Sequence, residues 1–184
     1  SMSRIAIPKS IEQAPEAARP LLEAVRKQIG STPNLFRLTS NSPAALEGYL
    51  GLNGALAKGA LDPATRERIA LAVAQINGCG YCLAAHSFMA KNIARLDPTE
   101  IAANRAGRSA DAKADAAVRF AVKIVEKRGG VAASDVAEAR AAGHSDAELV
   151  EIVAHVALNT LTNYINEAFE TEIDFPRVSL EQAA

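Results

Sequence analysis

The chain contains only two cysteines, Cys79 and Cys82, and they stand three residues apart. His86 follows Cys82 by four residues, and Glu67 precedes Cys79 by twelve. A thiol pair, an imidazole and a carboxylate within twenty residues indicate thiol–disulfide chemistry, because the reactive thiolate forms most readily beside a base or a cation. The short separation also predicts that the two cysteines can form a disulfide.

The local pattern places these residues around the start of a helix. Gly78 is expected to end the helix that carries Glu67, and the next helix is expected to begin around Cys79. Free backbone N–H groups and the helix dipole favour an anion at such a position. Cys82 and His86 are one helical turn apart on the same face, so the imidazole could take the thiol proton or pair with the thiolate.

Glu67 lies about three helical turns before the cysteines. If its helix and the next one form an antiparallel hairpin, the Glu67 carboxylate returns beside His86. There it would orient the imidazole and raise its basicity, which would complete a Cys–His–Glu relay. The alternative for Glu67 is a surface carboxylate paired with Arg66 or Arg68.

Two other interpretations of the cysteine pair remain open. Zinc is the main competitor, because the two cysteines, His86 and Glu67 would supply four ligands. Structural zinc sites usually draw on more Cys and His, however, and the chain shows no second ligand pair. The cysteines could also be inert, since a free Cys often behaves as a small buried hydrophobe.

The remaining candidates carry weaker signals. Tyr81, inside the Cys-x-x-Cys segment, could pack over the thiols or donate a hydrogen bond to a peroxide, and packing is favoured. His144 follows Gly143 at a helix boundary, so we expect it to be exposed. His155 lies close to an apolar stripe, which indicates a core or interface histidine.

The composition favours a single helical domain, residues 1–184, and two cysteines three residues apart without a signal-peptide pattern favour the reducing cytoplasm. At 184 residues with 4% aromatics, no Trp and abundant Ala, the chain suits close-packed helices. A formal net charge of −1 gives no indication of nucleic-acid or anionic membrane binding, and the apolar runs are too short to span a bilayer. The apolar start at residues 5–8 is too short for a signal peptide, and Ser1 is interpreted as a cloning remnant.

Helical spacing and capping residues predict an all-α fold. Ser42, Asp62 and Asp97 each precede a proline at a first helical position, and Asp97 with Glu100 and Ser145 with Glu148 resemble capping boxes. The last predicted helix is expected to break or bend near residues 159–162. The predicted helices cover residues 16–29, 43–58, 63–76, 80–95, 98–106, 111–128, 134–142 and 146–170.

A weak internal repeat relates residues 61–86 to residues 144–169. It aligns Ile69 with Ile152 and Val73 with Val156. The second segment has no cysteine or histidine at the positions of the candidate site. The interpretation is a duplicated helical hairpin with one active copy and one degenerate copy.

The order Glu67, eleven residues, Cys79-x-x-Cys82, three residues, His86 resembles the active-site motif of the alkylhydroperoxidase D group. That group belongs to the carboxymuconolactone decarboxylase superfamily. Residues 30–37 resemble the "PNLFR" entry segment of its peroxidase-related branch, and residues 169–176 resemble its "EIDFP" ending. The resemblance covers roughly residues 30–176.

The resemblance implies an all-α fold with a helical hairpin core, a homo-oligomer, and an antioxidant activity that needs no cofactor. It implies that Cys82 attacks the peroxide, that the more exposed Cys79 resolves it, and that His86 and Glu67 form the proton relay. Electrons would arrive by disulfide exchange. The best-known members carry His where this chain has Tyr81, which leaves the role of that position open.

The sequence therefore predicts a cysteine-dependent peroxidase or disulfide reductase that uses a dihydrolipoyl-type or thioredoxin-type dithiol donor. A thiol adaptor that passes electrons to a separate peroxidase would need the same residues. A zinc-stabilised, non-catalytic helical module is the alternative of another class. A lyase with His86 as the base is less favoured, because members that act as decarboxylases typically lack the cysteine pair.

Overall fold

The computed structural model describes residues 2–182, and Ser1 lies outside them. Within that range the regular structure is helical, as predicted, and contains no strand. None of the described helices is long and apolar enough to cross a membrane. The elements are η1 (Glu16–Ala18), α1 (Arg19–Ile29), α2 (Asn34–Thr39), α3 (Pro43–Leu56), α4 (Pro63–Asn77), α5 (Gly80–Asn92), α6 (Pro98–Arg105), α7 (Ala112–Glu126), α8 (Ala133–Ala141) and α9 (Asp146–Phe169).

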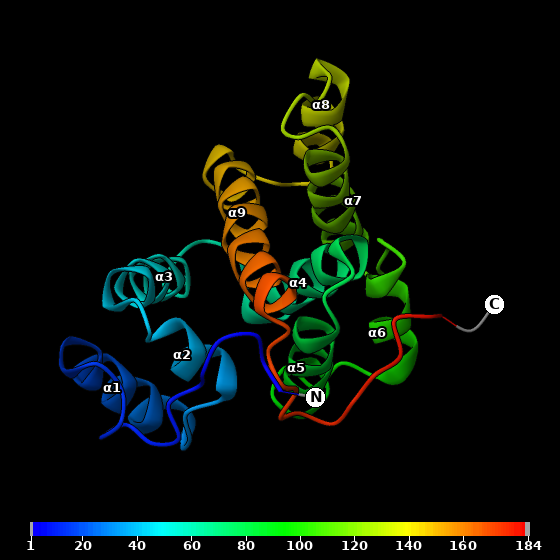
Figure 1. The fold of residues 1–184 in the computed structure, drawn as a ribbon. Helices are drawn as coiled ribbons and strands as arrows, with labels where there is room; N and C mark the ends of the chain where they lie inside the picture. The colour runs from blue at the N-terminus through cyan, green and yellow to red at the C-terminus, as the bar shows by residue number, and fades with distance from the viewer. Residues whose placement is uncertain (1, 183–184) are drawn as a thin grey trace.

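Helix α4 is the centre of the packing, because it contacts α5, α6, α7 and α9 (Figure 1). Helices α1, α2 and α3 gather on one side, and α7 and α8 extend away from the centre at the top of the view. The segment after α9 returns past α5 to α6, where Arg105 Nη2 donates to the Ser179 carbonyl over 2.6 Å. Helix α5 is thus packed against other parts of the chain on several sides.

Local capping signals determine where the helices start. The side chains of Ser42, Asp62 and Asp97 each accept a hydrogen bond from the backbone N–H three residues later, as predicted. Ser145 and Glu148 form the expected reciprocal capping box at the start of α9. These caps satisfy N–H groups that a helix leaves without partners.

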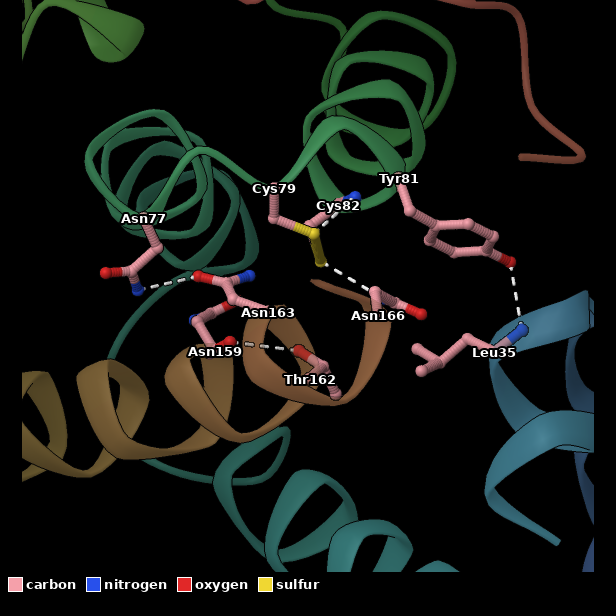
Figure 2. Close-up of a disulfide and its surroundings, with 9 residues drawn as sticks. All are labelled: Leu35, Asn77, Cys79, Tyr81, Cys82, Asn159, Thr162, Asn163 and Asn166. Carbon is pink, nitrogen blue, oxygen red and sulfur yellow. Dashed lines mark hydrogen bonds between the residues drawn. A yellow bond between two sulfur atoms is a disulfide. The ribbon is translucent and has the colours of Figure 1, made fainter. Parts of the chain in front are cut away.

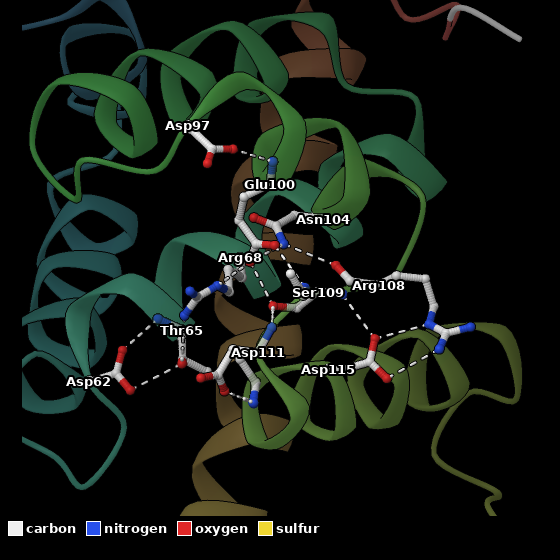
Figure 3. Close-up of polar contacts among 12 residues, drawn as sticks. Asp62, Thr65, Arg68, Asp97, Glu100, Asn104, Arg108, Ser109, Asp111 and Asp115 are labelled. Carbon is white, nitrogen blue, oxygen red and sulfur yellow. Dashed lines mark hydrogen bonds and ion pairs between the residues drawn. The ribbon is translucent and has the colours of Figure 1, made fainter.

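A buried ion network holds α4 against α6 and the start of α7 (Figure 3). Glu100 accepts hydrogen bonds from Arg68 Nε at 2.7 Å, Ser109 Oγ at 2.6 Å and the Ala110 N–H at 2.9 Å. Burial alone would raise the pKa of Glu100, but these bonds outweigh it and hold the pKa at about 2. The expected capping box with Asp97 is therefore only half made, because the Glu100 carboxylate is engaged here.

Two predictions about helix boundaries were wrong. Helix α2 occupies a stretch where no helix was predicted, and α9 continues through residues 159–162, where a break or bend was expected. Asn159 Nδ2 donates to the His155 carbonyl at 2.8 Å, and Thr162 Oγ1 donates to the Asn159 carbonyl at 3.1 Å. These side chains bond back to their own helix and leave it continuous.

The predicted second hairpin is also absent, because residues 146–169 form the single helix α9. The aligned core positions nevertheless share one environment. Ile69 and Val73 of α4 and Ile152 and Val156 of α9 are buried in the same apolar cluster. The repeat thus describes a common buried pattern and not a common supersecondary structure.

Candidate active site

The cysteine pair lies at the junction of α4 and α5. Gly78 ends α4 with a left-handed backbone at φ 67°, a conformation that costs glycine little because it has no Cβ. Cys79 is the N-cap of α5, and its Sγ accepts a hydrogen bond from the Cys82 N–H at 3.2 Å. The predicted position of the thiols at a helix start is confirmed.

Cys79 and Cys82 are joined as a disulfide, with their Cα atoms 5.3 Å apart (Figure 2). Both residues are buried, with exposed fractions of 0% for Cys79 and 3% for Cys82. The expectation that Cys79 would be the more exposed cysteine was therefore wrong. Both belong to an apolar cluster built mainly from α4 and α5, and the partly buried Ile173 and Phe175 of the C-terminal segment pack against it.

Glu67 and His86 meet across the α4–α5 hairpin. His86 Nδ1 lies 2.8 Å from Glu67 Oε2, and both side chains are about one-fifth exposed, at 20% and 22%. The neighbouring arginines have other partners: Arg66 donates to carbonyls at the end of α3, and Arg68 pairs with Glu100. Glu67 is thus the carboxylate that orients the His86 ring.

In this disulfide form, no hydrogen bond joins His86 to either sulfur among the described contacts. The imidazole is held through Nδ1, so Nε2 is the nitrogen left for chemistry. The structure therefore brings Glu67 to His86 and Cys79 to Cys82, but it does not join the two pairs into one continuous hydrogen-bonded chain.

A residue that the sequence analysis did not single out contacts the disulfide. Asn166 of α9 donates from Nδ2 to Cys82 Sγ at 3.2 Å, and it is 1% exposed (Figure 2). The available signal was the run of asparagines on the inner face of α9. Asn159, Asn163 and Asn166 recur at helical spacing among buried apolar residues, where a polar side chain needs a partner.

Tyr81 points away from the sulfurs and holds the surrounding chain together. Its hydroxyl donates to Asp174 Oδ1 at 2.7 Å and accepts the Leu35 N–H at 3.1 Å. Its ring packs edge-on against Phe175. Burial, together with the hydrogen bond to Asp174, raises the pKa of Tyr81, so the hydroxyl stays protonated. Tyr81 is thus a packing residue, but its ring packs against Phe175 and not over the sulfurs, and its hydroxyl ties the start of α2 and the C-terminal segment to α5.

The other two histidines lie outside the thiol site. His144 was predicted to be exposed, and this was wrong, because it is buried with Nδ1 3.1 Å from Glu148 and Nε2 2.7 Å from the Lys113 carbonyl. His155 is buried, as expected for a core residue. Burial lowers the pKa of His155, so it is held neutral in the core.

The four candidate zinc ligands are not arranged around a common point. The sulfurs are bonded to one another, and His86 Nδ1 is engaged by Glu67. Within residues 2–182, no group of three or more His, Cys, Asp or Glu side chains is placed to hold a metal ion. The geometry is that of a disulfide beside a carboxylate–imidazole pair.

Comparisons with known proteins agree with this fold. The sequence profile of the Carboxymuconolactone decarboxylase family matches residues 43–127, which include the whole α4–α5 hairpin. No curated protein matches the chain. Among solved structures, the alkylhydroperoxidase AhpD core protein of Ralstonia eutropha JMP134, described as an uncharacterized peroxidase-related protein, is 22% identical with a TM-score of 0.84. The match covers 95% of this chain and 93% of that one.

Two further structures are similar in fold. An uncharacterized peroxidase-related protein from Silicibacter sp. TM1040 is 22% identical with a TM-score of 0.79, over 92% of this chain and 91% of its own. The debrominase Bmp8, whose Cys→Ala variant was solved with 2,3,4-tribromopyrrole, is 20% identical with a TM-score of 0.78, over 95% and 94%. The family profile thus matches the thiol hairpin, and these likenesses show that the chain has the fold of the alkylhydroperoxidase D-like, peroxidase-related structures.

Proposed function

We propose that the protein is a thiol-dependent peroxidase that reduces hydroperoxides with the Cys79–Cys82 pair. The observation that carries the proposal is the disulfide at the start of α5, one helical turn from a histidine that a carboxylate holds. Two thiols at this position can deliver two electrons and end as the observed bond. No cofactor is needed for that reaction.

In the proposed cycle, the His86 imidazole takes the proton of the Cys82 thiol. The thiolate attacks one peroxide oxygen, the O–O bond breaks, and the leaving oxygen takes a proton to depart as an alcohol or water. Cys82 is then a sulfenic acid. The Cys79 thiol attacks its sulfur, water leaves, and the disulfide forms. Glu67 keeps the ring oriented and stabilises the imidazolium between the two proton transfers.

A dithiol donor of the dihydrolipoyl or thioredoxin type would complete the cycle. Its thiolate attacks one sulfur to give a mixed disulfide, and its second thiol releases the reduced enzyme. Because both sulfurs are buried, exposure gives no preference between Cys79 and Cys82 as the point of attack. The segments over α5 must therefore move to admit the donor.

The same residues could pass electrons to a separate peroxidase, and one assay distinguishes the two roles. Reduced protein is mixed with hydrogen peroxide or an organic hydroperoxide, and peroxide loss is followed with dihydrolipoyl and thioredoxin donors in separate arms. Turnover that disappears in Cys82→Ser supports the peroxidase. If the disulfide is reduced by a donor but peroxide is not consumed, the adaptor role is correct and the peroxidase proposal fails.

Two further arms test a different electrophile and the zinc-stabilised module. Because the debrominase Bmp8 shares the fold, one arm contains 2,3,4-tribromopyrrole and a dithiol donor. If bromide is released and peroxide is not consumed, the substrate is a brominated compound and the peroxidase proposal fails. Metal content after purification without added zinc tests the structural zinc module. A stoichiometric amount of zinc in reduced protein would overturn the redox proposal.

We also propose that the protein forms a homo-oligomer through the outer face of α9. Large apolar side chains stand exposed along that face at helical spacing, namely Val150, Val153, Leu161 and Tyr164. An exposed apolar stripe of this kind is typical of an interaction surface. Sedimentation at micromolar concentration tests the proposal, which fails if the native chain is a monomer.

A further inference from the structure

The two sulfurs of the disulfide receive hydrogen bonds from different parts of the fold. Cys79 Sγ accepts the Cys82 backbone N–H of its own helix, and Cys82 Sγ accepts Nδ2–H of Asn166 from α9. Both distances are 3.2 Å. The bond to Cys79 is an ordinary N-cap bond, which any N-cap side chain that can accept would make with the backbone. The bond to Cys82 depends instead on one side chain, which lies 84 positions away in the sequence.

The Asn166 bond gains strength when the disulfide is reduced. A bonded sulfur is a weak acceptor, but a thiolate carries a full charge, and hydrogen bonds to charged groups are roughly twice as strong as neutral ones. Burial adds to this effect, because water does not compete for the sulfur and the effective dielectric is low. The amide therefore stabilises the thiolate of Cys82 more than its thiol.

The orientation of the Asn166 amide agrees with this role. Only the orientation with the nitrogen toward Cys82 provides a hydrogen bond, because a thiolate sulfur can accept but not donate. The amide oxygen, Oδ1, is buried and has no hydrogen-bond partner among residues 2–182. A buried acceptor without a partner is costly, yet the amide keeps its nitrogen toward Cys82 although its oxygen gains no bond there.

We propose that Asn166 is a positioning residue that selects Cys82 as the attacking thiolate. The proposal rests on the proposed peroxidase function for its meaning, but it concerns a property of the reduced protein that no peroxide is needed to measure. Nδ2–H stabilises the negative charge on Cys82 and so favours that thiol as the one that ionises. Cys79 keeps its own donor and is unaffected by Asn166.

Single-cysteine proteins separate the two thiols. In Cys79→Ser the serine still caps α5, and only Cys82 titrates; in Cys82→Ser only Cys79 titrates. Asn166→Leu is then added to each, because leucine has nearly the shape of asparagine without its amide. The pH dependence of the alkylation rate is measured for all four proteins. Melting by circular dichroism verifies that they are folded.

The expected result is specific to one thiol. Asn166→Leu should move the pH midpoint of Cys82 alkylation upward by about one unit, because one hydrogen bond to the charged form is lost. Alkylation at pH 7 should slow by several-fold to about tenfold. The midpoint of Cys79 should not move. A structural defect in α9 would disturb both thiols, and that outcome, or no shift at Cys82, would overturn the proposal.

Asn163→Leu is the matched control. Asn163 lies one turn earlier on the same face, is fully buried and accepts Asn77 Nδ2–H at 2.9 Å, but among residues 2–182 the hydrogen bonds to sulfur come from Cys82 N–H and Asn166 and not from Asn163. It should leave the Cys82 midpoint in place, and an equal shift would refute the role of Asn166. If Asn166→Leu does not fold, the side-chain amide signals of Asn166 in native reduced protein are followed by NMR. The Asn166 signals should shift with pH at the midpoint of Cys82, whereas the Asn163 signals should not. If the Asn166 signals do not follow Cys82, the proposal is rejected.

Discussion

The α4–α5 hairpin and the helix α9 begin from similar patterns and end as different structures. Their aligned positions Ile69 and Ile152, and Val73 and Val156, are buried in one apolar cluster. The first segment then stops and turns at Gly78, whereas the second continues as one helix through the aligned Leu161. A residue that accepts a left-handed backbone ends a helix far more readily than a leucine does.

Because one segment turns and the other continues, each contributes a different group to the same site. The turn creates a new helix start, and the cysteines stand at it, where an anion is favoured. The uninterrupted helix has no such start, but it carries a polar side chain far enough along to reach Cys82. Segments with similar buried patterns thus supply the two cysteines from α4–α5 and the amide that contacts Cys82 from α9.

The largest expected effect comes from removing a thiol from the hairpin. Cys82→Ser should abolish disulfide formation and reduce peroxide consumption by at least about a thousandfold, because a serine hydroxyl is not ionised near neutral pH. Thiol titration before and after stoichiometric peroxide measures disulfide formation, and the loss of peroxide measures its consumption. Cys79→Ser is the matched variant, and it should accumulate a sulfenic acid detectable with a trapping reagent. Retention of both free thiols in peroxide-treated native protein would remove the redox interpretation.

A second effect concerns the anchors of the two segments. Arg68 fixes α4 through Glu100, while Glu151, the residue aligned with Arg68, accepts backbone N–H groups just before α4. The ordinary pKa of Glu100, 4.5, falls to about 2 in the fold. Ionised Glu100 therefore contributes stability above about pH 4.5, and that contribution is lost as the pH falls toward 2.

Glu100→Gln should accordingly lower the free energy of unfolding at pH 7 by about 2 to 3 kcal/mol. The difference from native protein should shrink as the pH falls below 4.5. Urea unfolding at several pH values measures both. Glu138→Gln is the control, because its ion pair with Arg119 is half exposed and should be worth less than about 1 kcal/mol. Equal losses in the two variants would contradict the buried network.

The relay can be tested in the hairpin alone, since α9 has Val150 where α4 has Glu67. Glu67→Gln should slow peroxide consumption by about tenfold and shift Cys82 alkylation to higher pH, because the imidazolium loses its counter-charge. His86→Ala should do the same more strongly. Glu47→Gln, an exposed glutamate on α3, serves as the control. If Glu67→Gln changes neither the titration nor the rate, Glu67 only supports the structure.

The smallest expected effect is at the turn itself. Gly78→Ala should lower the free energy of unfolding by about 1 kcal/mol, because alanine is strained at φ 67°. Gly51→Ala lies inside α3 with open space around its Cα, so it should stabilise the protein by up to about 1 kcal/mol. Thermal unfolding should show that the free energy of unfolding falls in Gly78→Ala and rises in Gly51→Ala. A stabilised Gly78→Ala would mean that the left-handed residue does not decide the break.

Much of the hairpin could be predicted from local signals. The caps at Asp62 and Ser145, the stop at Gly78 and the thiols at a helix start each depend on a few neighbouring residues. Even the pairing of Glu67 with His86 follows from two helices of known length joined by a short turn. Such features are determined within one or two elements, so the sequence alone was enough.

Other features were decided by the packing of distant elements. Cys79 is buried because it lies in a cluster covered by the C-terminal segment, and Asn166 reaches Cys82 across 84 positions of sequence. The Tyr81 hydroxyl is occupied because α2 and Asp174 meet it there. No periodicity or capping pattern encodes which remote side chain fills such a position. The sequence determined the dithiol, its helix start and its carboxylate–imidazole pair, while the tertiary structure decided which sulfur receives the Asn166 amide and that both are enclosed.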